Sequence, residues 1–238
     1  IYDDQDGQLI VDKIRAHLTK EDFSGMVNEI FTIGCKGDSH IHENQSIRHG
    51  RRIQDFVQNN LDSEFALESL WLEAMTPQQG RDRIKSAMRR GKGLVTYFGH
   101  AVLDGFQAMT TFHAMNAGNK EQGLAIFAGC DLVEPDRGTH GMGDMPVIRS
   151  REGFIGIISA SRSVLSNHNE SFANNIANSF FLNHEGKFRT STPTLGEVYA
   201  RAKDCTQNNS EMAYFYIGDP SLRVPLALKK VKLEIPQR

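Results

Sequence analysis

Two dipeptides, Gly99-His100 and Gly129-Cys130, hold the residues best suited to chemistry. A thiol attacks a carbonyl only as the thiolate, and a neighbouring imidazole can take its proton and later return it to a leaving amine. Backbone N–H groups at a tight turn can hold the oxyanion that develops during such an attack. A cysteine and a histidine that both follow glycine therefore predict nucleophilic catalysis on a carbonyl carbon.

Each residue on its own has a simpler interpretation. A single cysteine after an apolar run is more often a small buried core residue than a nucleophile, and a single histidine at the end of a strand is no stronger a signal. The catalytic interpretation depends on the pair, because His100 and Cys130 have the right types, both follow glycine and both end neighbouring apolar runs.

The two dipeptides end short apolar runs, residues 94–98 and 124–128. Such runs, ended by glycine, predict buried strands of a parallel sheet, whose carboxyl ends gather at one edge where functional groups lie. Further strands are predicted at 28–33, 65–72, 154–159 and 214–217, and helices at 9–17, 43–59, 77–90, 171–181 and 195–203. Thr76 and Pro77 supply an N-cap and a first helical residue. This alternation predicts an α/β fold with a mostly parallel central sheet flanked by helices.

Composition limits the classes of function. The chain has 238 residues with 39% hydrophobic residues and a formal net charge of -2, as in an ordinary globular protein. That charge argues against a nucleic-acid or anionic-membrane surface, and the longest apolar stretch, residues 154–160, is too short to span a bilayer. Three cysteines make no disulfide framework. Because the chain opens at Ile1, we expect a processed or excised piece, in which a missing signal peptide carries no weight.

Several segments, in order along the chain, resemble gingipain-like cysteine peptidases, which share a catalytic fold with caspases. Tyr97-Phe98-Gly99-His100 resembles the Tyr-x-Gly-His-Gly motif of that family. His42-Glu43-Asn44 resembles a family segment at a helix start, and residues 126–130 resemble the strand that ends in the nucleophile. Residues 157–161 and 218–222 resemble the next strand and a Gly-Asp-Pro-Ser-Leu segment near the end of the peptidase domain. Residues 194–197 are similar to the sortase-type member of type IX secretion.

The resemblance implies roles for particular residues. Cys130 is expected to be the nucleophile, through a thioester, and His100 the general base and acid. Backbone N–H groups near Ala101 and Cys130 are expected to form the oxyanion hole, with Gly99 and Gly129 in the turns. It also implies a caspase-like α/β sandwich that needs no cofactor, a protein or peptide substrate, and export to the cell surface or the extracellular space.

The resemblance also divides the chain. We expect residues 1–25 to end a preceding smaller subdomain, residues 26–228 to form the peptidase domain, and residues 229–238 to be a charged tail or a linker to further domains. The expected substrate pocket is lined by Asp38, Phe106, Ser161 and Arg162.

Departures from the family pattern leave two points open. Ala101 stands where the family has the second glycine of Gly-His-Gly, and Phe106 stands where it has tryptophan. The carboxylate that orients the histidine in arginine-specific members falls near Cys35 or Lys36, which cannot do that task, and the acid that binds a basic substrate side chain falls near Ser39, beside Asp38. The sequence therefore leaves open both the group that orients His100 and the preferred substrate side chain.

The residue types offer two candidate metal sites. His40 and His42, with His49 or Asp38, could bind zinc, but no further ligand pair stands at metal spacing, so no metal centre is predicted. The loop after Cys130 offers carboxylates to a structural calcium ion, with an ordinary solvated acidic loop as the alternative. These carboxylates belong to Glu134, Asp136 and Asp144.

The sequence thus predicts a cysteine endopeptidase and keeps two alternatives. An amine in place of water would resolve the thioester as a sortase-like transpeptidase does. A peptidase fold with a lost glycine and no orienting acid could instead serve as a non-catalytic binding or scaffold domain.

Overall fold

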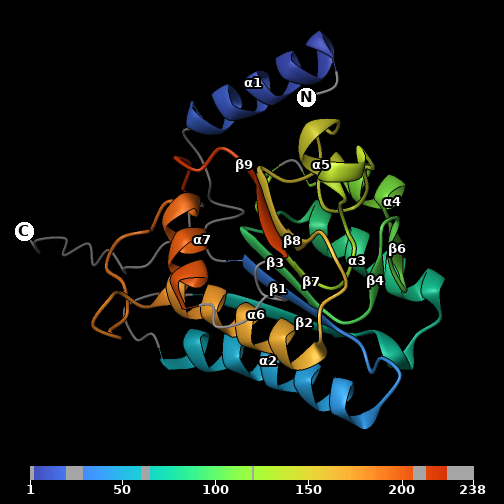
Figure 1. Cartoon of the computed structure of the whole chain (residues 1–238), viewed down its shortest axis with the longest axis vertical. Helices are drawn as coiled ribbons and strands as arrows, with labels where there is room; N and C mark the ends of the chain where they lie inside the picture. Colours follow the sequence, from blue (N-terminus) through green and yellow to red (C-terminus); the bar gives the residue numbers. More distant parts are fainter. Residues whose placement is uncertain (1–2, 20–28, 60–64, 120, 206–212, 224–238) are drawn as a thin grey trace, which may run out of the picture.

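The computed structural model describes residues 3–19, 29–59, 65–119, 121–205 and 213–223 (Figure 1). Among these residues, a six-stranded sheet has the order β2-β1-β3-β7-β8-β9. Its strands are β1 (Glu29–Gly34), β2 (Ala66–Trp71), β3 (Leu94–Phe98), β7 (Leu124–Ala128), β8 (Gly156–Ala160) and β9 (Tyr214–Gly218). All neighbours are parallel except β8 and β9. The predicted mostly parallel sheet is therefore confirmed.

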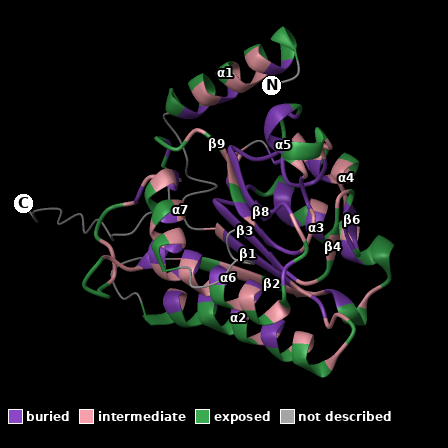
Figure 2. Ribbon diagram, viewed as in Figure 1, coloured by how far each residue is buried: buried purple, intermediate pink, exposed green. Residues whose placement is uncertain are grey.

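Helices cover both faces of this sheet (Figures 1 and 2). The helices of the described residues are α1 (Asp4–Leu18), α2 (His40–Asn59), α3 (Pro77–Arg89), α4 (Thr111–Met115), α5 (Met145–Ile148), α6 (Ser166–Phe181) and α7 (Leu195–Asp204). α1 lies apart from the sheet, next to α5 (Figure 1). Two 3₁₀ turns, η1 (Leu72–Ala74) and η2 (Pro135–Arg137), lie in connecting segments. Successive side chains of a strand point to opposite faces. In β3, Leu94 packs in the core cluster with α2, α6 and α7, whereas Val95 and Tyr97 pack in the cluster with α3.

The helix starts differ from the predicted ones in two places. α2 begins at His40, three residues before the predicted start, because Ser39 Oγ accepts a hydrogen bond from the His42 N–H and supports the first turn. α6 begins at Ser166, five residues before the predicted start at residue 171. The Asn169 side chain is buried there, donating to the Ala128 carbonyl and accepting from Tyr214 Oη.

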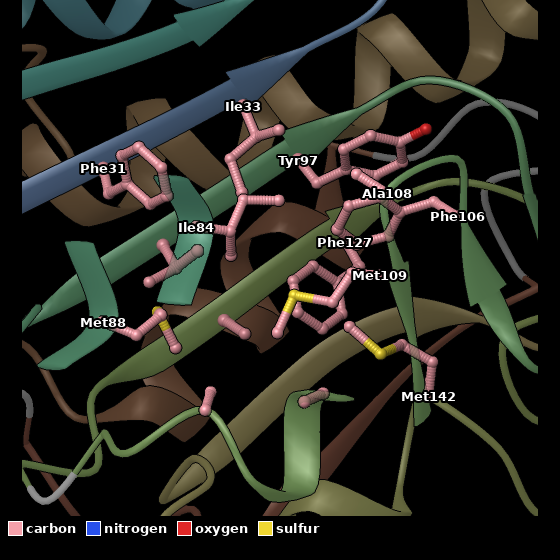
Figure 3. Close-up of a cluster of buried hydrophobic side chains, with 14 of the residues drawn as sticks. Phe31, Ile33, Ile84, Met88, Tyr97, Phe106, Ala108, Met109, Phe127 and Met142 are labelled. Atoms are coloured by element: carbon pink, nitrogen blue, oxygen red, sulfur yellow. The ribbon is translucent and has the colours of Figure 1, made fainter. Parts of the chain in front are cut away.

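A small antiparallel sheet follows β3 and had no signal in the sequence. Its strands are β4 (Ala101–Val102), β5 (Gly105–Phe106) and β6 (Met109–Thr110). Strands of two residues are too short to carry any periodicity. Phe106 of β5 packs face to face on Tyr97 of β3, with ring centroids 3.9 Å apart (Figure 3). The small sheet therefore closes over the carboxyl end of β3.

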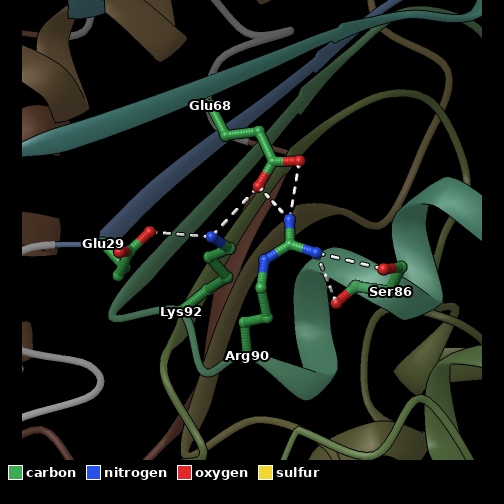
Figure 4. A network of polar contacts seen from close by, with 5 residues as sticks. All are labelled: Glu29, Glu68, Ser86, Arg90 and Lys92. Carbon is green, nitrogen blue, oxygen red and sulfur yellow. Dashed lines mark hydrogen bonds and ion pairs between the residues drawn. The ribbon is translucent and has the colours of Figure 1, made fainter.

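At the amino ends of the strands, a buried lysine joins β1 and β2 to the segment before β3 (Figure 4). Lys92 Nζ lies 2.8 Å from Glu29 Oε2 and 3.1 Å from Glu68 Oε2. Arg90 also binds Glu68 and holds Ser86 in α3. Because a buried ammonium must be paired, this network favours one register for the first three strands.

α1 is tied to the segment around α5. The Arg149 guanidinium binds both carboxylate oxygens of Asp6, and Lys13 Nζ donates to the carbonyls of Pro146, Val147 and Phe154. Burial lowers the pKa of Lys13 to about 7. The predicted boundary near residue 25 and the predicted tail from 229 lie outside the described residues, and both stay predictions. No helix in the described ranges is long and apolar enough to cross a membrane.

Candidate active site

The register of two neighbouring strands brings His100 and Cys130 to one place. β3 and β7 pair in parallel with Phe98 opposite Ala128, and the Gly99 N–H donates to the Ala128 carbonyl at 3.1 Å. The segments that follow β3 and β7 therefore leave the sheet at the same level. A cavity of about 220 Å³ opens at this edge. It is lined by His42, Phe98, Gly99, His100, Cys130, Val164, Leu165, Ser166 and Asn169. The predicted nucleophile and base thus line a single cavity.

The two turns require glycine because they approach each other closely. A Cβ on Gly129 would lie 2.6 Å from Ala101 Cβ and 3.1 Å from the Gly99 carbonyl oxygen, and a Cβ on Gly99 would overlap Cys35 Sγ. Ala101 itself begins β4 with ordinary backbone angles, since Gln122 and Asp131 are the positive-φ residues among the described non-glycine ones. The family's glycine at position 101 is therefore dispensable for this turn.

The His100 ring faces a carboxylate from the loop after β1. Its Nε2 lies 3.3 Å from Asp38 Oδ1. This hydrogen bond, together with the charges of His42 and His100, lowers the pKa of the Asp38 carboxyl and outweighs the opposing effect of desolvation. Tyr97 Oη, from β3, donates a hydrogen bond to the His100 carbonyl at 2.5 Å. Asp38, expected as a substrate-pocket residue, thus lies where it can orient the histidine.

Cys130 is half-buried and rests against the chain that follows β8. Its Sγ lies 3.5 Å from the Val164 carbonyl and accepts a hydrogen bond from the Val164 N–H at 3.4 Å. Burial raises the pKa of the Cys130 thiol, against the smaller lowering effect of the hydrogen bond from Val164. This shift favours the thiol over the thiolate, so the sulfur needs a base to become a nucleophile.

A second cavity, of about 670 Å³, shares His100 with the first. Its lining residues include Asp38, Glu73, Asp104, Phe106 and Met109. No lysine or arginine is among the described residues that line it, so three carboxylates set its charge. The expected pocket residues Asp38 and Phe106 therefore lie in this larger cavity.

Ser161 and Arg162 are not among the described residues that line either cavity. Ser161 is buried and donates to the Ala213 carbonyl at 2.9 Å, and the Arg162 guanidinium pairs with Asp136 on the surface. The chain turns outward after β8, and Val164 and Leu165 take the wall beside Cys130 instead. No sequence signal distinguished these two apolar residues. Asp38 had such a signal, because its loop leaves the carboxyl end of β1, the strand next to β3.

The residues that the sequence offered as zinc or calcium ligands do not gather into the two sets named there. Asp136 pairs with Arg162, Glu134 lies 3.0 Å from Arg137, and Asp144 lies 2.6 Å from His140 Nδ1. The three carboxylates of the loop after Cys130 thus face separate partners. Among the described residues, a group of three metal-ligating side chains occurs at Asp38, His42 and His100. His40 is exposed beside Glu43, and His49 is buried beneath Phe98.

Comparison with known proteins shows the family of this chain. The model of peptidase family C25 matches residues 1–225. The chain belongs to this family. No curated protein matches it in sequence. A crystal structure of the Arg-specific cysteine proteinase gingipain R has a TM-score of 0.78 and 14% identity, covering 96% of this chain and 55% of that one.

Two other solved structures have the same fold as this C25 chain. A complex of Porphyromonas gingivalis RgpB pro- and mature domains has a TM-score of 0.73 and 15% identity, and covers 96% of this chain and 56% of that one. A structure described as a protease has a TM-score of 0.66 and 15% identity, covering 94% of this chain and 54% of the other. The chain therefore spans little more than half the length of these structures. The predicted gingipain-like fold is confirmed.

His49 packs against Phe98, the last residue of β3, and should make stability depend on pH. It stacks on Phe98 with ring centroids 5.6 Å apart, and neither ring nitrogen has a hydrogen-bond partner among the described residues. Burial lowers the pKa of His49 to about 4. The unfolded chain, with a histidine pKa of ~6.5, binds more protons than the folded protein between pH 4 and 6.5. The free energy of unfolding should therefore fall by about 2 kcal/mol between pH 7 and 5.

The variant His49→Phe should remove most of that slope and raise stability at pH 7 by about 1–3 kcal/mol, since no unsatisfied ring nitrogen remains. An adjoining cavity of about 210 Å³ gives the larger ring room. Urea unfolding at pH 5, 6 and 7 measures both effects, with exposed His184→Gln as the control. An unchanged slope in His49→Phe would show that another group carries the pH dependence.

Proposed function

We propose that this domain is a cysteine endopeptidase in which Cys130 is the nucleophile and His100 the general base and acid. The observation that carries the proposal is the cavity that the two side chains share at the paired ends of β3 and β7. The contact between Asp38 and His100 Nε2 supports it, because it supplies the orienting carboxylate that the sequence pattern lacked.

The contact with Asp38 decides which nitrogen of His100 reacts. With Nε2 donating to the carboxylate, Nδ1 is the acceptor of the neutral ring. Nδ1 takes the Cys130 proton, the thiolate adds to the substrate carbonyl, and backbone N–H groups near Ala101 and Cys130 stabilise the oxyanion. The leaving amine then takes the proton from Nδ1 as the carbon–nitrogen bond breaks, and a thioester remains. Water, deprotonated by His100, hydrolyses the thioester and frees the thiol.

A transpeptidase is the second candidate, and the larger cavity favours it. The leaving amine receives its proton from His100, so an incoming amine approaches from the same side. There, the cavity with carboxylates of Asp38, Glu73 and Asp104 suits a cationic acceptor. In assays of peptide cleavage, an added amine should become joined to the acyl part of the substrate. The amount of this ligated product should rise as the amount of hydrolysed product falls.

Mechanism-based labelling tests the catalytic proposal against a non-catalytic binding domain. We expect a panel of peptidyl acyloxymethyl ketones with different terminal residues to include a reagent that alkylates Cys130 in the folded protein. Exposed Cys205 should remain unmodified and serves as the internal control. His100→Asn should abolish the labelling of Cys130. Equal labelling of both cysteines, or labelling that persists in His100→Asn, would favour a binding or scaffold domain.

Export to the cell surface or the extracellular space is part of the same proposal and rests on the family membership. Fractionation of the source cells tests it, because the protein should be recovered outside the cytoplasm.

A further inference from the structure

We propose that Asp38, His42 and His100 together form a binding site for one divalent transition-metal ion of the zinc type, and that the bound ion holds the peptidase inactive. The binding part of this inference stands on the geometry alone. The inhibitory part rests on the proposed function of His100.

The ligand atoms already lie near the spacing that zinc requires. Asp38 Oδ1 is 3.3 Å from His100 Nε2 and 2.5 Å from His42 Nδ1, and all three atoms lie within 4.8 Å of one another. In a tetrahedral site with bonds of about 2.0–2.1 Å, ligand atoms are about 3.3 Å apart. The Asp38–His100 pair matches this spacing, and the Asp38–His42 pair has to open by less than about 1 Å. The two histidine nitrogens, which lie within 4.8 Å of each other, have to close by up to about 1.5 Å.

The His42 ring presents a buried nitrogen to the Asp38 carboxylate. Its Nδ1 is buried and has no hydrogen-bond partner among the described groups, although the Asp38 carboxylate lies beside it. The two imidazole rings meet edge to face, with centroids 4.7 Å apart and planes at 78°. Two imidazole nitrogens and a carboxylate oxygen that converge in this way form a frequent zinc donor set, which leaves a fourth position for water.

The backbone keeps the three side chains together without a metal. Gly37 has a φ of 68°, and a Cβ there would lie 2.9 Å from His42 Cβ and 3.3 Å from His100 Cδ2. The loop therefore passes close to both rings, which only glycine at position 37 permits. The amino end of α2 disfavours a cation, because the backbone N–H groups there carry partial positive charge. The Asp38 charge at the site and the carboxylates of Glu73 and Asp104 in the adjoining cavity oppose that effect.

Binding would stop catalysis through a change of tautomer. A metal on Nε2 of a neutral His100 ring moves the ring proton from Nε2 to Nδ1. Nδ1 then has no lone pair with which to accept the Cys130 proton. The metal also occupies the Asp38 oxygen that otherwise orients the ring. Removal of the ion restores both, so the inhibition is reversible.

Zinc titration of the Cys130→Ala protein by calorimetry tests the binding, because that variant has no nucleophilic thiol at the site and needs no activity. Cobalt(II) absorption gives an independent readout of a tetrahedral donor set. We expect one ion per chain and an affinity more than about 10-fold weaker in both His42→Ala and the similarly sized His42→Gln. His40→Ala is the matched control, since His40 is exposed two residues away on the same helix and contacts Glu43 instead.

Equal zinc affinity in the His42 variants and in His40→Ala would overturn the inference. For the inhibitory part, zinc should suppress peptide cleavage by the wild-type enzyme, a chelator should restore it, and His42→Gln should need more than about 10-fold more zinc. A protein that binds zinc through His42 but cleaves no peptide would refute the proposed function and leave the site standing. An active enzyme whose cleavage is insensitive to zinc would refute the inhibitory part alone.

Discussion

Replacement of Cys130 by alanine is expected to lower kcat for peptide cleavage by at least about 10³-fold, because no thioester can form without the sulfur. The fold should survive, since Cys130 is half-buried at the margin of a core cluster and alanine keeps its Cβ. Steady-state cleavage of the best peptide found by the labelling panel measures the loss, with thermal unfolding as a check on structure.

Cys205→Ala is the matched control, because Cys205 is exposed at the end of α7, and its kcat should stay within about twofold of the wild type. Unchanged cleavage in Cys130→Ala would end the proposal that this residue is the nucleophile. Loss of cleavage in both variants would indicate that cysteine replacement harms the fold instead.

Replacement of Asp38 by asparagine should lower kcat/KM by about 10–100-fold, with most of the loss in kcat. The amide has nearly the same shape, but it can donate to Nε2 and so favour the tautomer whose Nδ1 carries the proton. That tautomer cannot accept the Cys130 proton. The effect should be smaller than for a buried orienting acid, because the Asp38 side chain is 71% exposed.

Separate measurement of kcat and KM distinguishes positioning of His100 from substrate binding, since a pure binding role would raise KM and leave kcat unchanged. The low pKa of Asp38 adds a second readout. Its contact with His100 should persist from neutral pH down to below the usual carboxyl range and be lost only as pH falls through the lowered pKa. Glu43→Gln, a neighbouring carboxylate that contacts His40, should change kcat by less than about twofold. A wild-type kcat in Asp38→Asn would remove Asp38 from the mechanism.

Local patterns were sufficient for most of the elements that hold the site. The apolar runs ended by Gly99 and Gly129 became β3 and β7, which are buried along their whole length, and Thr76 caps α3 with the reciprocal bonds to Gln79 that the N-cap predicts. These features depend on residues close in the sequence, for which propensity and period are direct signals. The start of α6 was missed because the partners of Asn169, in β7 and β9, are distant in the chain.

The sequence by itself determined the residue types at the site, the strand ends that carry them and the family to which their order belongs. Only the tertiary structure decided that Asp38 faces His100, that Val164 and Leu165 line the cavity beside Cys130, and that His42 completes a cluster of three metal-ligating side chains. The physical reason is the distance along the chain over which the determining interactions act. A strand end can be predicted from its neighbours in the sequence. The direction of a loop side chain depends instead on packing between segments that meet only in the folded protein.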